Sequence, residues 1–402
     1  MRSRQFRLLW AGQTISVAGS QMQSVALNWH IYALTHSTIA LGVIGLVRVV
    51  PIVVFSLLGG AVADAADRRR VLYATQLAML GATGTLAALT HYDRITVVGI
   101  YVITAFSSAA IAFNNPARQS LVPALVPRKH FANAASLTSI AHQLATIFGP
   151  MAAGLLMARS SLAVIYGINA ASFIAVIIAL VMMGPVKLAE GDGERSEVNL
   201  AAMKEGLQFV AKTPMLVWTI VLDFLATFFS SASALLPVFA KDILHVGARG
   251  YGILAAAQGV GSLLAGAAVS FMPAIRRQGW TVIWSVVVYG AATVVFGATE
   301  WFWLSWVALA ATGAADTVST ILRQTIRQLV TPDRLRGRMT AAGMIFFMGG
   351  PQLGELEAGL AARWIGAQWS VISGGIGCLI SVVIVAAKAR ELREYVVPDH
   401  ES

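Results

Sequence analysis

The stretch LGVIGLVRVVPIVVFSLLGGAVADAADRRR, residues 41–70, decides the class of fold. Residues 41–63 hold a single charged side chain, Arg48, and the stretch ends in three arginines at positions 68–70. A helix that crosses the hydrocarbon core of a bilayer needs about 20 mostly apolar residues. Lipid also offers no hydrogen-bond partner to an open backbone. The stretch therefore predicts a membrane-spanning helix followed by a charged loop.

The rest of the chain repeats this pattern of long apolar runs. Its 402 residues are 57% hydrophobic and 12% charged, whereas a soluble domain carries about 25% charged residues. We therefore predict an all-α membrane protein with about twelve transmembrane helices. The single cysteine, Cys378, leaves no disulfide framework and no paired-cysteine metal site. The predicted spans are 8–34, 38–63, 71–90, 95–114, 133–157, 162–183, 214–240, 250–272, 280–299, 302–322, 339–365 and 368–388.

Lysines and arginines collect on one side of this predicted topology. With the N-terminus taken as cytoplasmic, 23 of the 29 fall in inner segments and five in outer ones. The inner count includes Arg118, Arg323 and Arg327, which are placed just beyond the ends of predicted spans. This positive-inside asymmetry predicts that both termini are cytoplasmic. Because the net charge of +10 is spread over many turns, it also argues against a nucleic-acid partner.

The two halves of the sequence repeat each other. Residues 56–63 (SLLGGAVA) match residues 262–269 (SLLAGAAV) at an offset of 206, and residues 118–121 (RQSL) match residues 323–326 (RQTI) at an offset of 205. Two parallel six-helix halves with a site between them are a known transporter architecture. We therefore predict such a pair of pseudo-repeats.

The longest polar stretch, 184–213, divides these repeats. We predict an N-terminal six-helix bundle at 1–183, a cytoplasmic linker at 184–213, and a C-terminal six-helix bundle with a short cytoplasmic tail at 214–402. The linker is either a plain connection or a helix that lies along the membrane surface, because four apolar residues recur in it at helical spacing. They are Leu200, Met203, Leu207 and Val210.

Several motifs resemble those of the major facilitator superfamily. The loop from Gly60 to Arg70 (GAVADAADRRR) is similar to its signature loop, and the segment from Gly149 to Gly154 (GPMAAG) is similar to the glycine-proline motif of its proton-coupled exporters. Residues 115–119 (NPARQ) with Asn133-Ala134, and residues 335–338 (LRGR), resemble the branch of enterobactin exporters and of macrolide and multidrug efflux pumps. The resemblance covers essentially the whole chain and implies the fold of that superfamily.

The resemblance implies a cytoplasmic gate at the signature loop, in which Asp64 matches the gate carboxylate. An acid at such a position can accept hydrogen bonds from the free amides of a neighbouring helix. The arginines can pair with carboxylates across the gate or can simply anchor the loop. The loop departs from the common pattern at Ala65, where a basic residue is usual, and at Asp67, where many members have glycine. The candidate gate residues are Gly60, Asp64, Asp67, Arg68, Arg69 and Arg70.

The motif Gly149, Pro150 and Gly154 in the fifth span has a mechanical interpretation. Proline removes one helix hydrogen bond, and glycine lets another helix approach closely. The surface therefore suits a hinge or a seal between the halves; plain packing of small residues is the alternative. Many proton-coupled exporters carry an arginine in span 4, and the predicted span 95–114 has none.

Charged residues inside the spans are the sharpest functional signal. An ionised residue at the middle of a bilayer costs about 2.5–3.5 kcal/mol on insertion scales, so each needs a partner or a water-filled cavity. His30 and His142 are expected to be packed and hydrogen-bonded, and Asn28, Gln143 and Asn169 either line a cavity or join helices. The candidate coupling or substrate residues are Arg48, Asp223, Asp316, Glu355 and Glu357.

We expect Arg48 to pair with Glu355 or Asp223 in one state, and protonation of the carboxylate to release the pair and let the halves rock. Gly349, Gly350 and Pro351 are expected to interrupt span 11 just before its carboxylates, which points to a transporter site there. Glu355 is favoured over Glu357 because the adjoining Gly354 would let solvent or substrate approach. A static ion pair that only joins helices is the alternative. Asp316 could instead lie near the cytoplasm and be solvated.

The sequence thus predicts a secondary active transporter, in particular a proton-coupled exporter of small amphipathic compounds such as drugs, macrolides or siderophore-like metabolites. An importer or facilitator on the same fold, or a receptor or scaffold that transports nothing, is the alternative. The chain has no catalytic or nucleotide-binding motif, so we expect no enzyme activity, cofactor or metal. The expected partners are a small-molecule substrate, protons and the lipid bilayer of a bacterial inner membrane, and the chain is expected to act as a monomer.

Overall fold

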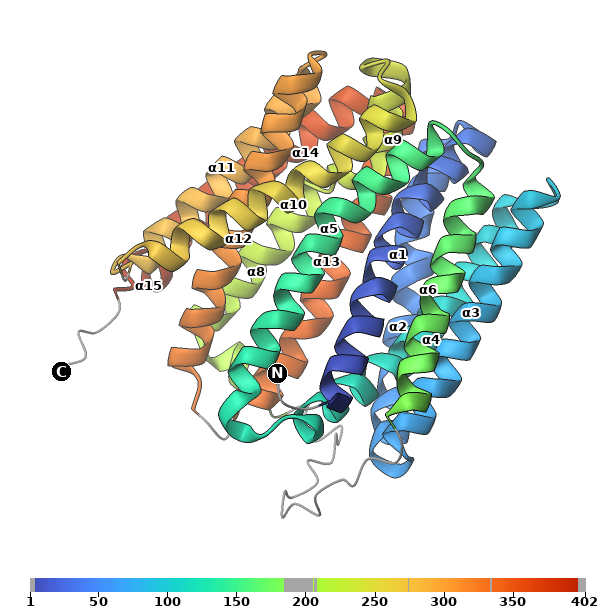
Figure 1. The fold of residues 1–402 in the computed structure, drawn as a ribbon. Helices are drawn as coiled ribbons and strands as arrows, with labels where there is room; N and C mark the ends of the chain where they lie inside the picture. The colour runs from blue at the N-terminus through green and yellow to red at the C-terminus, as the bar shows by residue number, and fades with distance from the viewer. Residues whose placement is uncertain (1–3, 184–204, 206–207, 274, 333–334, 397–402) are drawn as a thin grey trace. The chain divides into compact units, whose positions relative to one another are not determined.

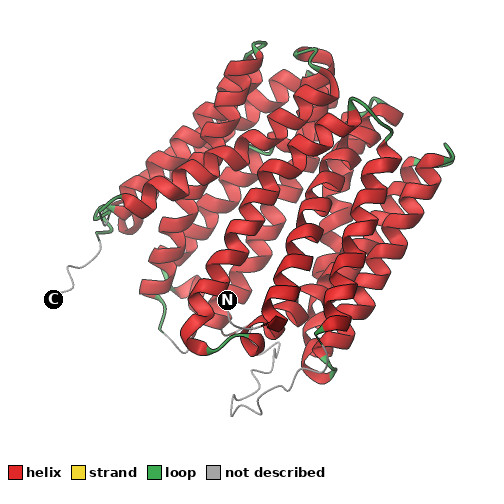
Figure 2. Cartoon of the chain, in the orientation of Figure 1, coloured by secondary structure: helices red, strands yellow, loops and turns green. Residues whose placement is uncertain are grey.

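The computed structural model describes residues 4–183, 205, 208–273, 275–332 and 335–396. Helices form nearly all of this part of the chain, and no strand occurs in it (Figure 1, Figure 2). The all-α prediction is therefore confirmed. The long helices are α1 (Arg4–Thr35), α2 (Thr38–Ala65), α3 (Arg68–His91), α4 (Val97–Leu125), α5 (Phe131–Met157), α6 (Leu162–Met182), α8 (Pro214–Phe229), α10 (Gly247–Phe271), α11 (Gln278–Ala298), α12 (Phe302–Val330), α13 (Arg336–Ile365) and α14 (Ala367–Lys388).

Each predicted span falls on one of these helices. Within the described residues, nine segments are long and apolar enough to cross a membrane, and they belong to α2 to α6, α8 with its continuation to Ile243, α10, α11 and α14. The remaining long helices, α1, α12 and α13, also occupy predicted spans. The chain is therefore a multi-pass membrane protein.

Two helices run further than the sequence predicts. Helix α4 continues past residue 114 to Leu125, and α12 continues past residue 322 to Val330. Arg118, Arg323 and Arg327 therefore lie on helices and not in loops, and the prediction that span 4 lacks an arginine is wrong. The predicted boundaries stopped at the first strongly polar residues. Helices continue through such residues where a neighbour satisfies them, as Thr75 Oγ1 accepts a 2.9 Å hydrogen bond from Asn114.

The broken membrane helix is the seventh span and not the eleventh. Helix α8 ends at Phe229, and the chain continues as a 3₁₀ turn (Ala232–Leu235), a short helix α9 (Leu236–Val238) and a π turn (Phe239–Ile243). The hydroxyl of Ser231 donates to the carbonyl of Thr227 at 2.9 Å, in competition with the backbone. Helix α13, in contrast, runs through Pro351 without a break.

The described chain divides into two compact units that do not coincide with contiguous halves. Unit 1 comprises Met1–His36, Leu46–Val198 and Gly247–Ala256, and unit 2 comprises Ser37–Gly45, Asn199–Val246 and Ala257–Ser402. The predicted division into bundles 1–183 and 214–402 stays a prediction. Of the predicted linker helix, Leu200, Met203 and Leu207 lie outside the described residues. Val210 is buried and packs with Leu216, Ile220 and Met339.

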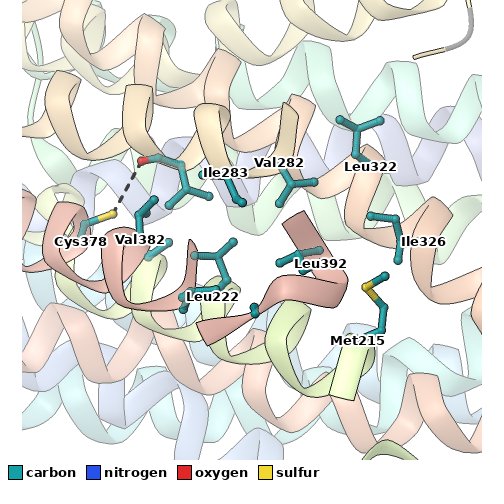
Figure 3. Packing of buried hydrophobic residues seen from close by; sticks show 13 residues of the cluster. Met215, Leu222, Val282, Ile283, Leu322, Ile326, Cys378, Val382 and Leu392 are labelled. Carbon is teal, nitrogen blue, oxygen red and sulfur yellow. Dashed lines mark hydrogen bonds between the residues drawn. The ribbon is translucent and has the colours of Figure 1, made fainter. Parts of the chain in front are cut away.

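A hydrophobic core in unit 2 joins α8, α11, α12 and α14 (Figure 3). Leu222 of α8 and Leu322 of α12 both belong to it and are buried. Asp223 and Arg323 directly follow these two leucines in the sequence. The packing of this core therefore fixes the two helices that carry the charged residues described below.

A corresponding core in unit 1 joins α1, α3, α4 and α6. Leu9, Leu72, Leu121 and Leu180 are almost completely buried in it. Burial of one such side chain contributes about 1.5–3 kcal/mol relative to exposure. In both units, apolar contacts between helices hold a site of more polar residues in place.

Close helix contacts in unit 2 depend on glycine. A Cβ atom added at Gly313 of α12 would collide with the carbonyl oxygen of Gln258 in α10, and one added at Gly261 would collide with the carbonyl of Ala310. Ser262 Oγ also donates to the carbonyl of Gly313 at 3.0 Å. Such close backbone approach is the general use of small residues between membrane helices.

We therefore expect Gly313→Ala to destabilise the protein by about 1–3 kcal/mol, because the added methyl group forces α10 and α12 apart. Gly84→Ala is the matched control, since a Cβ at Gly84 meets no atom within 4 Å and alanine favours a helix. The measurement is the unfolding temperature of each purified variant in one detergent. Equal unfolding temperatures for the two variants would contradict the close contact.

Candidate functional site

Four charged residues gather between α8 and α12 in unit 2. Arg323 Nη2 lies 2.5 Å from Asp223 Oδ1 and 3.8 Å from Asp316 Oδ1. Arg327 Nη2 lies 3.9 Å from the second oxygen of Asp223. The two acids and two arginines are formally neutral together, so the cluster is electrically balanced.

Neutral donors and acceptors complete this cluster. Arg323 donates to Ser319 Oγ at 2.8 Å and to Thr320 Oγ1 at 3.1 Å, one turn earlier on its own helix. Arg327 donates across to α8, to the hydroxyl of Thr219 at 3.3 Å and to its carbonyl at 3.0 Å. The guanidinium of Arg327 also lies 4.3 Å from the centre of the Phe347 ring, which is a cation–π arrangement.

Burial separates the two acids of the cluster. The side chain of Asp223 is 13% exposed and that of Arg323 is 3% exposed, whereas that of Asp316 is 49% exposed. Removal of one partner from a buried ion pair leaves an uncompensated charge, so Asp223 and Arg323 depend on each other. Asp316 is half exposed and lies 3.8 Å from Arg323 Nη2. The cluster therefore links a buried carboxylate to a half-exposed one through a single arginine.

Sequence reasoning found the two acids of this cluster and missed its two arginines. Arg323 and Arg327 were counted as cytoplasmic loop charges, yet both are buried residues of α12. Their four-residue spacing, together with Asp316 seven residues before Arg323, was the available signal. These three residues lie along one side of a helix.

Glu355 and Glu357 lie in α13, and Glu355 is buried. Ser233 Oγ donates to Glu355 Oε1 at 3.4 Å, and a Cβ on Gly45 would lie 2.9 Å from Glu355 Oε2. The expectation that Gly354 admits solvent or substrate is wrong. Gly354 instead lets the carbonyl of Phe228 approach, and a Cβ there would collide with it.

Arg48 belongs to unit 1 and donates to Asn28 Oδ1 at 3.3 Å. Asp223 belongs to unit 2, where it pairs with Arg323 and Arg327, so the pairing of Arg48 with Asp223 in another state stays a prediction. Glu355 belongs to unit 2, so the pairing of Arg48 with Glu355 stays a prediction.

Other polar residues of unit 1 join helices. His30 is buried, and its Nδ1 lies 3.1 Å from the Tyr166 hydroxyl. Asn169 donates to Gln23 Oε1 at 2.6 Å. These contacts connect α1 to α6, so His30 is packed and hydrogen-bonded as the sequence suggested.

Within the described residues, two arginines of the signature loop bind backbone carbonyls. Arg68 donates to the carbonyl of Ser120 at 3.2 Å, and Arg69 Nε donates to the carbonyl of Leu180 at 2.8 Å. Cations are favoured near helix C-termini, where carbonyl groups lack partners. Asp67 caps α3 by accepting from the Arg69 amide at 2.9 Å. The structure does not describe the side chain of Asp64.

An acid at position 67 therefore has a structural reason. Its exposed carboxylate also lies 3.8 Å from Arg70 Nε. Many members of the superfamily have glycine at this position, and glycine has no side chain that could cap the helix. Asp67 therefore adds a helix cap that those members lack.

The glycine-proline motif of α5 packs against α1 and against the part of α10 that belongs to unit 1. A Cβ on Gly149 would lie 2.7 Å from Gln21 Cβ in α1. A Cβ on Gly252 of α10 would lie 2.5 Å from the carbonyl of Pro150 and 2.6 Å from Gly154 Cα. Next to Gly252, the Tyr251 ring stacks on Trp29, with centroids 5.4 Å apart. The motif thus makes the tight junction of α5 with the first turns of α10.

Comparison with known proteins agrees with these features. The chain matches the MFS_3 family model, described as transmembrane secretion effector, over residues 1–399. A protein from Shigella boydii serotype 18 named enterobactin exporter EntS is 26% identical over 391 residues, which cover 97% of this chain and 93% of the relative. Its namesake from Escherichia coli O139:H28 is 25% identical over the same extent.

Solved structures share the fold. The nucleoside transporter NupG has a TM-score of 0.80 at 12% identity, with 96% of this chain and 99% of that chain covered. A bacterial homologue of the human lysosomal transporter Spinster, in an inward-facing and unoccupied conformation, has a TM-score of 0.72 at 14% identity and 98% coverage of both chains.

We expect substitution of the two acids of this cluster to lower the stability of the protein by unequal amounts. Asp223→Asn should destabilise the protein by about 3–5 kcal/mol, because it leaves Arg323 and Arg327 buried beside a neutral amide. Asp316→Asn removes a half-exposed acid and should cost much less. Thermal unfolding of both variants in one detergent measures the difference. Similar losses for the two variants would show that the pair between Asp223 and Arg323 does not hold α8 against α12.

Proposed function

The chain belongs to the transmembrane secretion effectors of the major facilitator superfamily, so it is a secondary transporter that exports small molecules and not an enzyme; we propose that a proton gradient drives this export. The resemblance identified from the sequence motifs is confirmed by that membership. The observation that supports proton coupling most directly is the ion pair between Asp223 and Arg323. A buried ionisable pair in a membrane helix bundle is typical of proton relays.

Protonation of Asp223 would change the charge balance of the four-residue cluster. The neutral acid no longer compensates Arg323 and Arg327, which leaves Asp316 as the remaining acid near Arg323. Arg323 then shifts toward Asp316, and α8 and α12 stay joined mainly through the hydrogen bonds of Arg327 to Thr219. We propose that the half-exposed Asp316 passes the proton to the cluster.

The break after α8 would let this helix move when Asp223 is protonated. Helix α8 stops at Phe229, six residues beyond Asp223, and the chain continues in short irregular turns. Helix-terminal residues of this kind can absorb the backbone changes of a hinge. A shift of α8 against α12 can therefore occur without bending a continuous helix.

We propose a small amphipathic compound as the cargo. The relatives named enterobactin exporters are similar to this chain over 97% of its length, which supports a siderophore-like metabolite, a macrolide or another drug-like molecule. We place the protein in a bacterial inner membrane, because these relatives are bacterial. The excess of lysine and arginine on one side supports cytoplasmic termini. We further propose that two six-helix halves rock about the site and that one chain suffices.

Glu355 and Arg48 form the second candidate for coupling. Glu355 is buried on α13, and Arg48 has a hydrogen bond from Nη2 to Asn28. In this alternative, Glu355 carries the proton in place of Asp223. The two carboxylates are separable by single substitutions.

We expect Asp223→Asn to abolish transport driven by a pH gradient. The test uses proteoliposomes and a panel of amphipathic compounds that includes enterobactin and a macrolide, with pH-driven accumulation and compound–compound exchange measured separately. Exchange should persist while accumulation stops. Glu355→Gln should keep both if Asp223 carries the proton and should lose accumulation if Glu355 does.

A double variant, Asp223→Asn with Arg323→Gln, separates coupling from stability. It removes both charges of the pair, so its unfolding temperature should recover toward that of the wild type. Accumulation should remain absent. If the double variant recovers both accumulation and stability, the ion pair is only structural. If the wild type transports no compound of the panel against its gradient, proton-driven export of these compounds is contradicted.

A separate expectation concerns the signature loop. Asp64→Asn should leave membrane insertion intact and reduce transport strongly, because the loop loses a charge-assisted contact at the proposed gate. Arg70→Gln is a control on the same loop, since Arg70 is exposed and lies 3.8 Å from Asp67. A well-expressed Asp64→Asn protein with normal export would show that this acid is not part of a gate.

A further inference from the structure

A cavity of about 650 Å³ lies within unit 1, between α1, α4 and α5. Its apolar wall includes Phe6, Leu9, Val122 and Phe131. Binding sites for drug-sized molecules typically measure about 300–1,000 Å³ and are mostly apolar with a few placed polar groups. The cavity has the size and character of such a site.

The polar groups of this cavity include several hydrogen-bond donors. Arg118 and His142 line it from α4 and α5. Trp10 and Gln13 line it from α1, and within the described structure Trp10 Nε1 and Gln13 Nε2 are buried without a hydrogen-bond partner. Unsatisfied buried donors are costly. They are therefore a sign of a ligand that supplies acceptors.

None of the described residues that line this site is an acid. The sequences of α1, α4 and α5 contain no aspartate or glutamate. The only acids in residues 1–183 are Asp64, at the end of α2, and Asp67 and Asp93, which lie between helices. Among the salt bridges of the described residues, none involves Arg118. The positive charge of Arg118 thus faces the cavity without a carboxylate from its own bundle.

The internal repeat makes this absence informative. Arg118 and Arg323 are matching residues of the two repeats, 205 positions apart, and lie on the matching helices α4 and α12. In unit 2, Asp223 and Asp316 neutralise Arg323. The corresponding helices of unit 1 kept the arginine and hold no such acids. Arg323 is thus neutralised by acids of its own unit, whereas the helices around Arg118 carry no acid.

We propose that this cavity binds the acidic end of the exported compound, so that the cargo is an organic anion: a carboxylate, sulfonate or phenolate on an apolar, ring-containing body. This inference rests on the proposed export function and names the chemical class of its substrate. The anionic group pairs with Arg118 and accepts hydrogen bonds from Trp10 and Gln13, while the ring system packs on Phe6 and Phe131. Charge-assisted hydrogen bonds of this kind are about twice as strong as neutral ones.

The position of the cavity fits entry of a cargo from the cytoplasm. It is lined by the first half of α1, the end of α4 and the first half of α5. The excess of lysine and arginine predicts that these ends lie on the cytoplasmic side. An exporter takes up its cargo from that side.

A matched pair of dyes tests the proposal on the purified full-length protein in lipid nanodiscs. 1-Anilinonaphthalene-8-sulfonate carries the anionic group, and N-phenyl-1-naphthylamine is the same ring system without it. Fluorescence titration, corrected with empty nanodiscs, gives both dissociation constants. Wild-type protein should bind the sulfonate at least about tenfold more tightly, which is the factor that corresponds to about 1.4 kcal/mol.

Two substitutions should remove this preference in different ways. Arg118→Gln deletes the charge, and His142→Glu supplies an acid on the facing helix that neutralises it. Each should weaken sulfonate binding about tenfold and change neutral-dye binding by less than about twofold. Arg118→Lys should keep most of the preference. Arg7→Gln, which removes an exposed charge from α1, should have no effect.

Equal affinities of the wild type for the two dyes would overturn the proposal, and so would an unchanged preference in a folded Arg118→Gln or His142→Glu protein. Because the wild-type comparison needs no variant, a variant that fails to fold does not leave the proposal undecided. Binding is measured without a gradient. Failure of proton-driven export with a retained sulfonate preference would therefore contradict the proposed function and leave the anion site standing.

Discussion

The hydrocarbon core of a membrane does not tolerate an uncompensated charge, and this constraint organises unit 2. Asp223 and Arg323 are each acceptable there only because the other lies 2.5 Å away. The pair joins α8 to α12, and the apolar core around Leu222 and Leu322 holds both helices in register. An interaction on which the packing depends is also one that a single proton can alter. The same contact can therefore stabilise one state of a transporter and release it for another.

The internal repeat shows two solutions to this constraint. In unit 2, Arg323 is neutralised by residues of its own bundle, and no cargo charge is needed there. In unit 1, Arg118 stands beside a cavity whose three helices contain no acid. A duplicated bundle that diverged in this way can divide its tasks, with the balanced copy serving coupling and the unbalanced copy serving recognition. This division of tasks needs only that acids surround one of the two matching arginines, Arg323, and are absent from the helices around the other, Arg118.

Much of the fold could be predicted from the sequence, because a bilayer imposes a length and an apolar composition on every helix. The long helices fall on the predicted spans, and Asp223 and Asp316 were identified as candidate charges. The errors have a common physical origin. Arg323 and Arg327 were read as loop residues because hydropathy records the side chain and not its partner across the interface. The sequence predicts a break at Gly349, Gly350 and Pro351, yet α13 runs through these residues. The break instead follows α8, where the hydroxyl of Ser231 donates to the carbonyl of Thr227. Partners and competitors of this kind depend on the tertiary fold.

An anionic cargo would change the energetics of export. A proton that enters the cell moves one positive charge inward, and an organic anion that leaves moves one negative charge outward. With the cell interior negative, the membrane potential favours both movements. At about 2.3 kcal/mol per charge for each 100 mV, a one-for-one exchange gains about 4.6 kcal/mol per cycle from the potential alone. A neutral cargo would gain half as much. Arg118 in one bundle and Asp223 in the other would thus draw on the same electrical gradient, because each would take up a charge that moves in the favoured direction.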